Sequence, residues 1–368
     1  MAPPRKAPAW SWIFPFAGLA LFGLISAFGL RMELDGSWLS IVLDASVALV
    51  LIGAVFAAVY HSEAIAHFTG EPYGTLILTA AVTVIELALI VSVMLTGESS
   101  PSLARDTVYS VVMIVCNGLV GVCILRGGLR FREQSFEVTS VNIYLAVLIV
   151  MATITLILPN YAVASPGPVY SDSQLVFISG ATVALYGVFL YTQTVRHTAY
   201  FVPESDAANG LPDAPHWRRV ILLNGTLLVV ALIAVVLLAK KFATVVDQGI
   251  STAGAPQAAV GVIIAFLILL PESMSALQAA RRDELQKSLN LALGSSLATI
   301  GLTVPAVAAV NIVLQEKLVL GLEPKEIALL VMTFAASMLT LGTGRTNILF
   351  GFVHLVIFAT FLFLTLVP

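Results

Sequence analysis

Residues 79–95 read TAAVTVIELALIVSVML, an apolar run with one carboxylate, Glu86, near its centre. Together with the apolar residues on either side, the run is long enough to cross about 30 Å of hydrocarbon as a helix. An ionisable group at that depth is costly, so its presence indicates a functional site. The alternative is a protonated glutamate that only hydrogen-bonds between helices. The stretch therefore predicts a membrane-embedded protein with an intramembrane carboxylate.

The composition of the whole chain agrees with this prediction. Of 368 residues, 59% are hydrophobic and 11% are charged, and the formal net charge is −3. The mean hydropathy is +0.98. Because soluble domains carry about 25% charged residues, a soluble globular protein is excluded. The near-neutral charge offers no basic surface for nucleic acid, and the absence of phosphate-binding, H-E-x-x-H and G-x-S-x-G motifs predicts neither an enzyme nor a bound cofactor.

Apolar windows of about 20 residues recur along the chain. They predict an all-α polytopic membrane protein with about eleven transmembrane helices, the first retained rather than cleaved as a signal peptide. The predicted spans are 11–30, 38–60, 74–96, 107–126, 138–158, 173–195, 218–239, 256–279, 288–314, 325–341 and 346–366.

Charge and composition divide this array of helices. With the N-terminus inside, cytoplasmic segments collect twelve Lys or Arg residues and the other side six, which predicts a cytoplasmic N-terminus and an opposite C-terminus in the cell (inner) membrane. The proline-rich, hydrophilic segment 196–217 predicts a cytoplasmic linker. We expect an N-terminal tail and helix over 1–37, and one five-helix repeat on each side of the linker, over 38–195 and 218–368.

Oxygen-bearing side chains accompany Glu86 along its predicted helix. They recur at spacings of 4, 4, 4 and 3, which places them on one helical face. Such a stripe is typical of the lining of an ion path. Its members are Glu71, Thr75, Thr79, Thr83 and Glu86.

A second intramembrane carboxylate, Glu272, follows AFLILL and Pro271. A proline removes a backbone donor, so we expect a break or kink that exposes polar backbone beside the acid, as in transporter ion sites. The alternative is that the span ends near Leu270 and Glu272 caps a cytoplasmic helix.

The two acidic spans are five crossings apart and therefore antiparallel, as two inverted five-helix repeats require. Each is followed by a helix with a polar face and with glycines that permit close helix approach. In the second repeat these residues are Ser288, Ser295, Thr299 and Thr303, with Asn290, Ser296, Gly294 and Gly301 nearby; in the first they are Ser110, Asn117 and Gly121.

Two histidines flank a glutamate directly after the second predicted span, in HSEAIAHFTGEP. Because His61 and His67 are six residues apart, they do not share a helical face, and metal-site spacing is absent. We interpret this segment as a short amphipathic stretch at the cytoplasmic surface. His61, Glu63, His67 and Glu71 are candidates for cation entry or pH sensing.

Four further residues carry simpler expectations. Asp44 lies early in the second span, where we expect its side chain to snorkel to the interface, and Asn224 occupies a similar depth in the seventh span. Cys116 and Cys123 are about 10 Å apart on a helix, too far for a disulfide, and we interpret both as packing residues.

Three segments together resemble the calcium/proton antiporter family, in its bacterial ChaA-like branch of the cation/calcium exchanger superfamily. They are EAIAHFTGEPYGTLILTAAVTVIELALI from Glu63, GGLRFREQSF from Gly127, and PESMSALQAARRDELQKSLNLALGSSLATIGLTVPAVA from Pro271. The resemblance implies an inverted repeat of five helices, with one additional N-terminal helix in this branch. It implies transport of Ca²⁺, or of Na⁺ or K⁺, in exchange for protons.

The resemblance also implies roles for individual residues. Glu86 and Glu272 would be the paired metal-binding carboxylates, Ser295 and Ser296 would match a Gly-Ser-Ser motif, and Glu63 an acidic position before the first repeat. The chain departs from many relatives where they carry Gly-Asn before each acid. Its residues there are Val82, Thr83, Ile268 and Leu269, which lack the asparagine oxygen.

The residues then suggest a mechanism. Two acids in a low-dielectric site repel each other, so protons compete with a cation for the same carboxylates. Because Ca²⁺ prefers six to eight oxygens, Thr79, Thr83, Ser295, Asn290, freed backbone carbonyls and water are candidate ligands. We expect proton-coupled Ca²⁺ export by alternating access, with Na⁺ or K⁺ exchange at the same site as the alternative. A passive cation channel and an intramembrane hydrolase are further alternatives.

Overall fold

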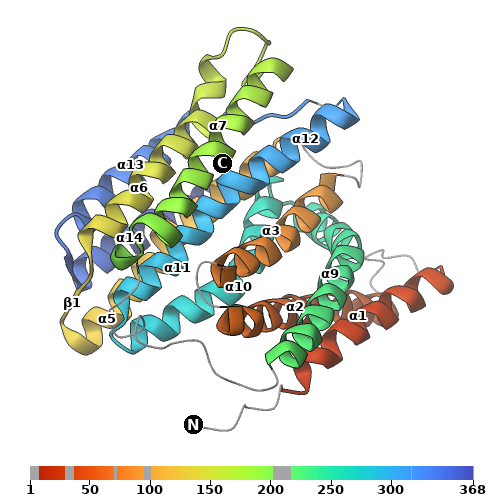
Figure 1. The fold of residues 1–368 in the computed structure, drawn as a ribbon. Helices are drawn as coiled ribbons and strands as arrows, with labels where there is room; N and C mark the ends of the chain where they lie inside the picture. Colours follow the sequence, from red (N-terminus) through yellow and green to blue (C-terminus); the bar gives the residue numbers. More distant parts are fainter. Residues whose placement is uncertain are drawn as a thin grey trace. The chain divides into compact units, whose positions relative to one another are not determined.

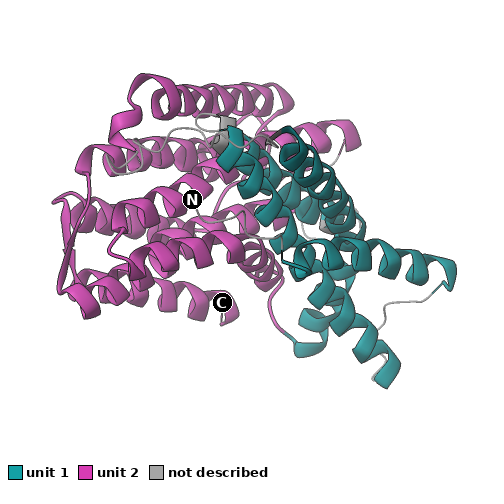
Figure 2. Ribbon diagram, turned by 60° about the horizontal axis from the view of Figure 1, so that its bottom comes forward, with its two compact units in different colours: residues 1–99, 210–254 teal, residues 100–209, 255–368 magenta. Residues whose placement is uncertain are grey.

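The computed structural model describes residues 8–29, 37–69, 73–94, 101–201, 217–315 and 317–367. It is mainly helical (Figure 1) and divides into two compact units (Figure 2). Unit 1 comprises residues 1–99 and 210–254, and unit 2 comprises residues 100–209 and 255–368. Each unit is described separately below.

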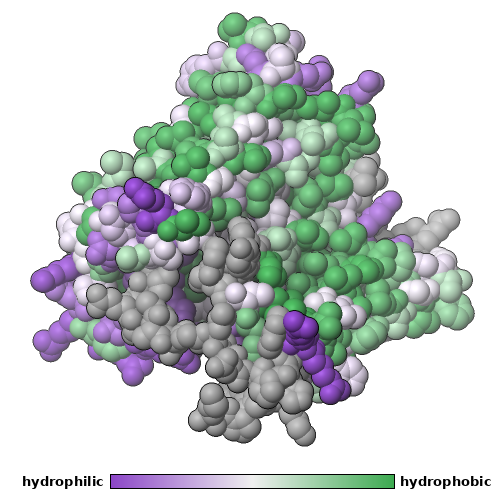
Figure 3. Space-filling model, in the orientation of Figure 1, coloured by the Kyte–Doolittle hydropathy of each residue, from purple (hydrophilic) through white to green (hydrophobic). Residues whose placement is uncertain are grey.

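The predicted spans are confirmed. Within the described residues, ten helices are long and apolar enough to cross a membrane, and α3 adds a shorter apolar helix over Ile77–Ser92. These correspond one to one to the eleven predicted spans. Large apolar side chains such as Leu222, Val313 and Leu339 are more than 70% exposed, as expected of lipid-facing positions. In Figure 3, hydrophobic side chains cover broad areas of the visible described surface.

Unit 1 is built around α2, which packs against α1, α3 and α9. Small residues permit close packing of α1 against α9, since a Cβ at Gly18 of α1 would lie 3.0 Å from the Cβ of Ala234 in α9. The helices of unit 1 are α1 (Trp10–Ala27), α2 (Trp38–Thr69), α3 (Tyr73–Met94) and α9 (Trp217–Ala253).

Unit 2 contains seven spans, several of which change helix type along their length. Within the described residues its α-helices are α4 (Leu103–Met113), α5 (Val120–Phe131), α6 (Val138–Ala152), α7 (Asp172–Tyr191), α10 (Ala258–Arg281), α11 (Leu285–Ala298), α12 (Val304–Leu314), α13 (Pro324–Leu341) and α14 (Ile348–Leu366). The π-helical segments are η1 (Ile114–Leu119), η2 (Thr153–Ile157), η4 (Thr192–Arg196) and η6 (Thr299–Thr303), and the 3₁₀ segments are η3 (Leu158–Tyr161) and η5 (Thr198–Tyr200).

Two short strands, absent from the sequence prediction, join neighbouring loops of unit 2. β1 (Glu133–Ser135) pairs antiparallel with β2 (Arg345–Asn347). The buried Gln134 of β1 donates a 2.7 Å hydrogen bond from Nε2 to Asp283 Oδ1, in the turn between α10 and α11. The loops after α5, α10 and α13 therefore lie together at one end of unit 2, as the predicted alternation of spans requires.

Two element boundaries differ from the prediction. α2 continues without interruption to Thr69, so the separate amphipathic stretch after the second span is wrong. α10 continues through Pro271 to Arg281, so a break at the proline and a span that ends near Leu270 are both wrong, whereas a kink at Pro271 stays a prediction. Transmembrane helices tolerate proline because neighbouring helices and side chains satisfy the freed backbone groups.

Candidate cation and proton site

Glu86 lies in the middle of α3 in unit 1 and is only 2% exposed. One turn earlier, Thr83 is half-buried and donates from Oγ1 to the Thr79 carbonyl at 2.8 Å. Its hydroxyl proton is thus held by the helix, while the oxygen keeps lone pairs for a cation. Thr79 is half-buried on the same helix. Glu71, predicted to extend this stripe, lies outside the described residues.

Glu272 lies in the interior of α10 in unit 2, and it is half-buried. The preceding Pro271 is buried and has no N–H, so the carbonyl of Leu267, four residues earlier, lacks its usual helical donor. A carboxylate close in sequence to a carbonyl without its usual helical donor is a suitable set of oxygen ligands for a hard cation. Glu86 and Glu272 belong to different units.

Helix α11 packs directly against α10 and carries the Ser295–Ser296 pair. Ser295 is half-buried, whereas Ser296 is fully buried. Within the described residues, the Ser296 hydroxyl oxygen has no hydrogen-bond partner, and neither has that of the buried Thr303. Buried hydroxyls without partners are rare, so these two atoms are available to water or to a cation.

The span that holds these residues is not a uniform α-helix. Residues 299–303 form the π-helical segment η6, which adds a residue to the turn and changes the register of the following side chains. The predicted common face is therefore only partly present, because Ser288, Thr299 and Thr303 are buried but Ser295 is not. Gly301 confirms the expected close approach, since a Cβ there would lie 2.7 Å from Tyr186 Cγ.

Both asparagines proposed as ligands already hold protein contacts. Asn290 accepts from Gln286 Nε2 at 2.9 Å and donates from Nδ2 to the Phe201 carbonyl at 2.8 Å. Asn117, fully buried in η1, donates from Nδ2 to Thr333 Oγ1 at 2.9 Å. Neither amide is directed toward Glu272 by these contacts.

The sequence analysis missed His354 of α14, the other partner of Asn117. Its Nδ1 lies 3.2 Å from Asn117 Oδ1, and its Nε2 lies 2.8 Å from Thr340 Oγ1. The side chain is fully buried. The signal was present, because His354 is an ionisable residue inside an apolar run of nineteen residues.

The candidates for entry or pH sensing separate into two groups. Glu63 and His67 are exposed near the end of α2, but His61 is completely buried and bonds to Asn224 of α9. Asp44 is also buried, at 6% exposure, so the predicted snorkelling to the interface is wrong.

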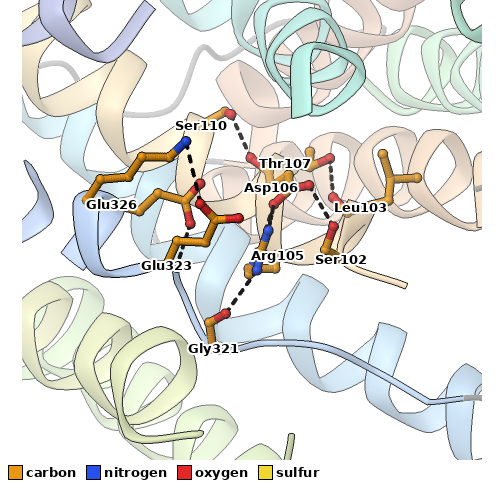
Figure 4. A network of polar contacts seen from close by, with 10 residues as sticks. Ser102, Leu103, Arg105, Asp106, Thr107, Ser110, Gly321, Glu323 and Glu326 are labelled. Atoms are coloured by element: carbon orange, nitrogen blue, oxygen red, sulfur yellow. Dashed lines mark hydrogen bonds and ion pairs between the residues drawn. The ribbon is translucent and has the colours of Figure 1, made fainter. Parts of the chain in front are cut away.

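A polar network that the sequence did not predict lies at the other end of unit 2 (Figure 4). Arg105 Nη2 is 2.7 Å from Asp106 Oδ1 and its Nη1 donates to the Gly321 carbonyl at 3.0 Å. Ser102 Oγ donates to Asp106 Oδ2 at 2.9 Å. These contacts attach the start of α4 to the loop before α13, which supports the prediction that both lie on one side of the membrane.

The two cysteines lie in the interior of unit 2. Cys116 and Cys123 are free and buried, which confirms their interpretation as packing residues. In the part of the chain that the structure describes, no group of three or more His, Cys, Asp and Glu side chains could hold a metal ion.

An array of about eleven spans in two inverted five-helix repeats, preceded by one helix, with a carboxylate inside one span of each repeat, defines a multi-pass membrane ion transporter. Residues 39–195 and 224–367 match the family described as sodium/calcium exchanger protein. The chain belongs to this family, in its ChaA-like branch.

Individual relatives support this assignment. The chain is 46% identical over 363 residues to "Putative ionic transporter y4hA" of Sinorhizobium fredii, covering 98% of this chain and 97% of the relative. It is 36% identical to the sodium-potassium/proton antiporter ChaA of Escherichia coli, covering 85% of each. It is 23% identical to the Ca²⁺/H⁺ antiporter ChaA of Bacillus subtilis, covering 75% and 79%. The structure of YfkE has the same fold, with a TM-score of 0.72 at 17% identity over 97% of this chain and 100% of that one.

Proposed function

We propose that this protein exports Ca²⁺ from the cytoplasm in exchange for protons, and that Glu86 and Glu272 bind the cation and the protons alternately. The observation that carries the proposal is the intramembrane carboxylate of α10, beside Pro271 and on a helix packed against α11 with its unpartnered Ser296 hydroxyl. Carboxylates inside a membrane-spanning helix are suited to reversible protonation, because desolvation disfavours their charged form.

Neutral oxygens complete the proposed coordination shell. Thr79 and Thr83 supply them on α3, and Ser296 and the Leu267 carbonyl supply them in unit 2, with water for the rest. Ser295 is a further candidate, whereas the contacts of Asn290 and Asn117 give both amides a structural role. Glu63, His67 and Glu71 are proposed to attract cations at the cytoplasmic side, which assumes a cytoplasmic N-terminus.

The two units support an alternating-access mechanism. Transporters of this kind open to each side in turn when one bundle moves as a rigid body against another. The first acid lies in unit 1 and the second in unit 2. Exchange follows if the protonated form and the cation-loaded form can each change between the inward-open and outward-open states. The empty form, with two charged carboxylates, must not make this change.

A second candidate cargo is Na⁺ or K⁺. One specific observation favours it, because the identity to the sodium-potassium/proton antiporter is 36%, against 23% to the Ca²⁺/H⁺ antiporter. The apolar residues Val82, Ile268 and Leu269 at positions where many relatives carry Gly-Asn also reduce the number of oxygen ligands. The same carboxylates could serve either cargo.

The test is a flux assay in liposomes with a pH-sensitive dye in the lumen. Addition of Ca²⁺ is expected to release protons, and Glu86→Gln and Glu272→Gln are each expected to abolish the response. Glu284→Gln, at an exposed turn outside the site, is the matched control and keeps it. A response to Na⁺ or K⁺ alone would replace the Ca²⁺ proposal by monovalent exchange. Cation flux without proton movement would indicate a channel.

A further inference from the structure

His61 is the one completely buried histidine of unit 1 within the described residues, and it joins three helices. It lies on α2, with Nδ1 2.7 Å from Asn224 Oδ1 on α9 and Nε2 3.0 Å from the Ser11 carbonyl on α1. The protonation state of the His61 ring depends on whether each of these two partners donates or accepts.

The Ser11 carbonyl can only accept a hydrogen bond. In a regular helix it would accept from the N–H four residues later, but that residue is Pro15, which has none. The proline therefore leaves this carbonyl for His61, and Nε2 must carry a proton to reach it.

The Asn224 oxygen is also fixed as an acceptor. The amide nitrogen Nδ2 donates at 2.9 Å to the Val220 carbonyl, one turn earlier on α9. Reversal of the amide would place two oxygens against each other, because a carbonyl cannot donate. The atom that faces His61 is therefore Oδ1, and Nδ1 of the ring must carry a proton as well.

A neutral imidazole has one N–H and cannot satisfy two acceptors at once. We propose that His61 is a proton-binding site of unit 1, separate from the two glutamates, and that the described arrangement is its doubly protonated imidazolium form. Deprotonation would leave one ring nitrogen facing an acceptor lone pair and would release either α1 or α9 from α2.

The charged groups near His61 are few in the described part of unit 1. On α2 itself Glu63 and His67 are exposed, and Asp44 is more than four turns away along the helix. On α9, Arg218 and Arg219 are exposed, while Lys240, Lys241 and Asp247 lie more than four turns beyond Asn224. α1 contains no titratable residue, and α3 contributes Glu86.

Gain and loss of this proton would make the contacts of His61 in unit 1 depend on pH. At low pH His61 donates hydrogen bonds to both α1 and α9. As the pH rises, it loses one of these two hydrogen bonds. The consequence for transport rests on the proposed antiport function. The protonation state of His61 does not rest on that function, so the proton site and the antiport function can be refuted separately.

The first measurement is nitrogen NMR of the full-length protein, labelled at histidine, from pH 5 to pH 9. His61→Gln assigns the signal of His61, and His67→Gln assigns that of the exposed histidine on the same helix. We expect both ring nitrogens of His61 to carry protons at pH 6, with one proton lost as the pH rises. A singly protonated His61 ring at pH 5 to 6 in the folded protein would overturn the proposal.

Partner variants separate a proton site from a purely structural contact. Asn224→Asp replaces the neutral acceptor by a carboxylate, so it is expected to move the loss of the proton to higher pH. Pro15→Ala restores a helical donor to the Ser11 carbonyl and is expected to move it to lower pH. If the two variants shift the titration in the same direction or not at all, the proposed assignment is wrong.

Transport then tests the functional consequence. In liposomes with wild-type His61, the pH profile of exchange is expected to follow the NMR titration, and Asn224→Asp to shift both together. If Asn224→Asp retains exchange and its pH profile of exchange is not shifted, His61 would still be a proton site but would have no regulatory role in transport. Loss of exchange in wild-type protein would instead contradict the proposed function.

Discussion

At the scale of a single side chain, the Ser296 hydroxyl adds nothing to stability that a packing residue would need. Its hydroxyl is fully buried and has no partner within the described residues, so it contributes desolvation cost without a compensating bond. A residue retained only for packing would be equally well served by alanine. This is why we propose its oxygen as a ligand of the transported cation.

The corresponding prediction concerns Ser296→Ala. The substitution is expected to leave the melting temperature unchanged or raise it, while the apparent KM for the cation increases several-fold. Ser110→Ala is the control, because the Ser110 hydroxyl is also buried but donates at 2.6 Å to the Asp106 carbonyl. An unchanged KM in Ser296→Ala would exclude this oxygen as a ligand.

At the scale of elements, the segment from Gly127 to Phe136, which covers the end of α5 and the strand β1, has a structural explanation. It contains the GGLRFREQSF motif, and its Gln134 holds Asp283 while Arg130 Nη1 donates to the Arg281 carbonyl at 3.1 Å. The motif thus attaches the end of α5 to the turn that connects α10 and α11. It fixes the helices around Glu272 rather than binding the cation itself.

A glycine in the last turns of α5 supplies a stability prediction. A Cβ at Gly127 would overlap the Gln134 side-chain oxygen, so Gly127→Ala displaces that amide from Asp283. We expect a loss of about 1–3 kcal/mol in unfolding free energy, the cost of a broken buried polar contact. The measurement is thermal unfolding in detergent.

The matched control is Gly180→Ala in α7. A Cβ there meets nothing within 4 Å, and alanine favours helix by up to about 1 kcal/mol over glycine. It should unfold at the same or a higher temperature than the wild type. Equal destabilisation by both substitutions would contradict the proposed role of the segment from Gly127 to Phe136.

Elements also show where prediction from sequence ends. Apolar length placed every span because lipid imposes it directly on the chain. The four π-helical segments of the described residues have no such signature. A π-helical turn within a span changes neither the apolar composition of that span nor its approximate length in sequence. Contacts between distant residues were equally invisible: nothing near His61 in sequence indicates that Asn224 accepts its hydrogen bond, 163 residues away.

At the scale of the whole molecule, the repeat explains why two acids were found in spans five crossings apart. The family match in two segments, 39–195 and 224–367, is similar to the predicted repeats 38–195 and 218–368, whose bounds remain a prediction. Which residues form each carboxylate's neighbourhood was only partly predictable. The stripe on α3 follows from periodicity, whereas the proline-containing α10 required the structure to show that it continues.

The central claim is that a cation and protons compete for Glu86 and Glu272. The most direct measurement is the release of protons into weakly buffered detergent solution when Ca²⁺, Na⁺ or K⁺ is added to the purified protein, with binding followed in parallel by calorimetry. The account predicts proton release in proportion to bound cation, lost in Glu86→Gln and in Glu272→Gln and retained in Glu284→Gln. Cation binding without proton release in the wild type would contradict it.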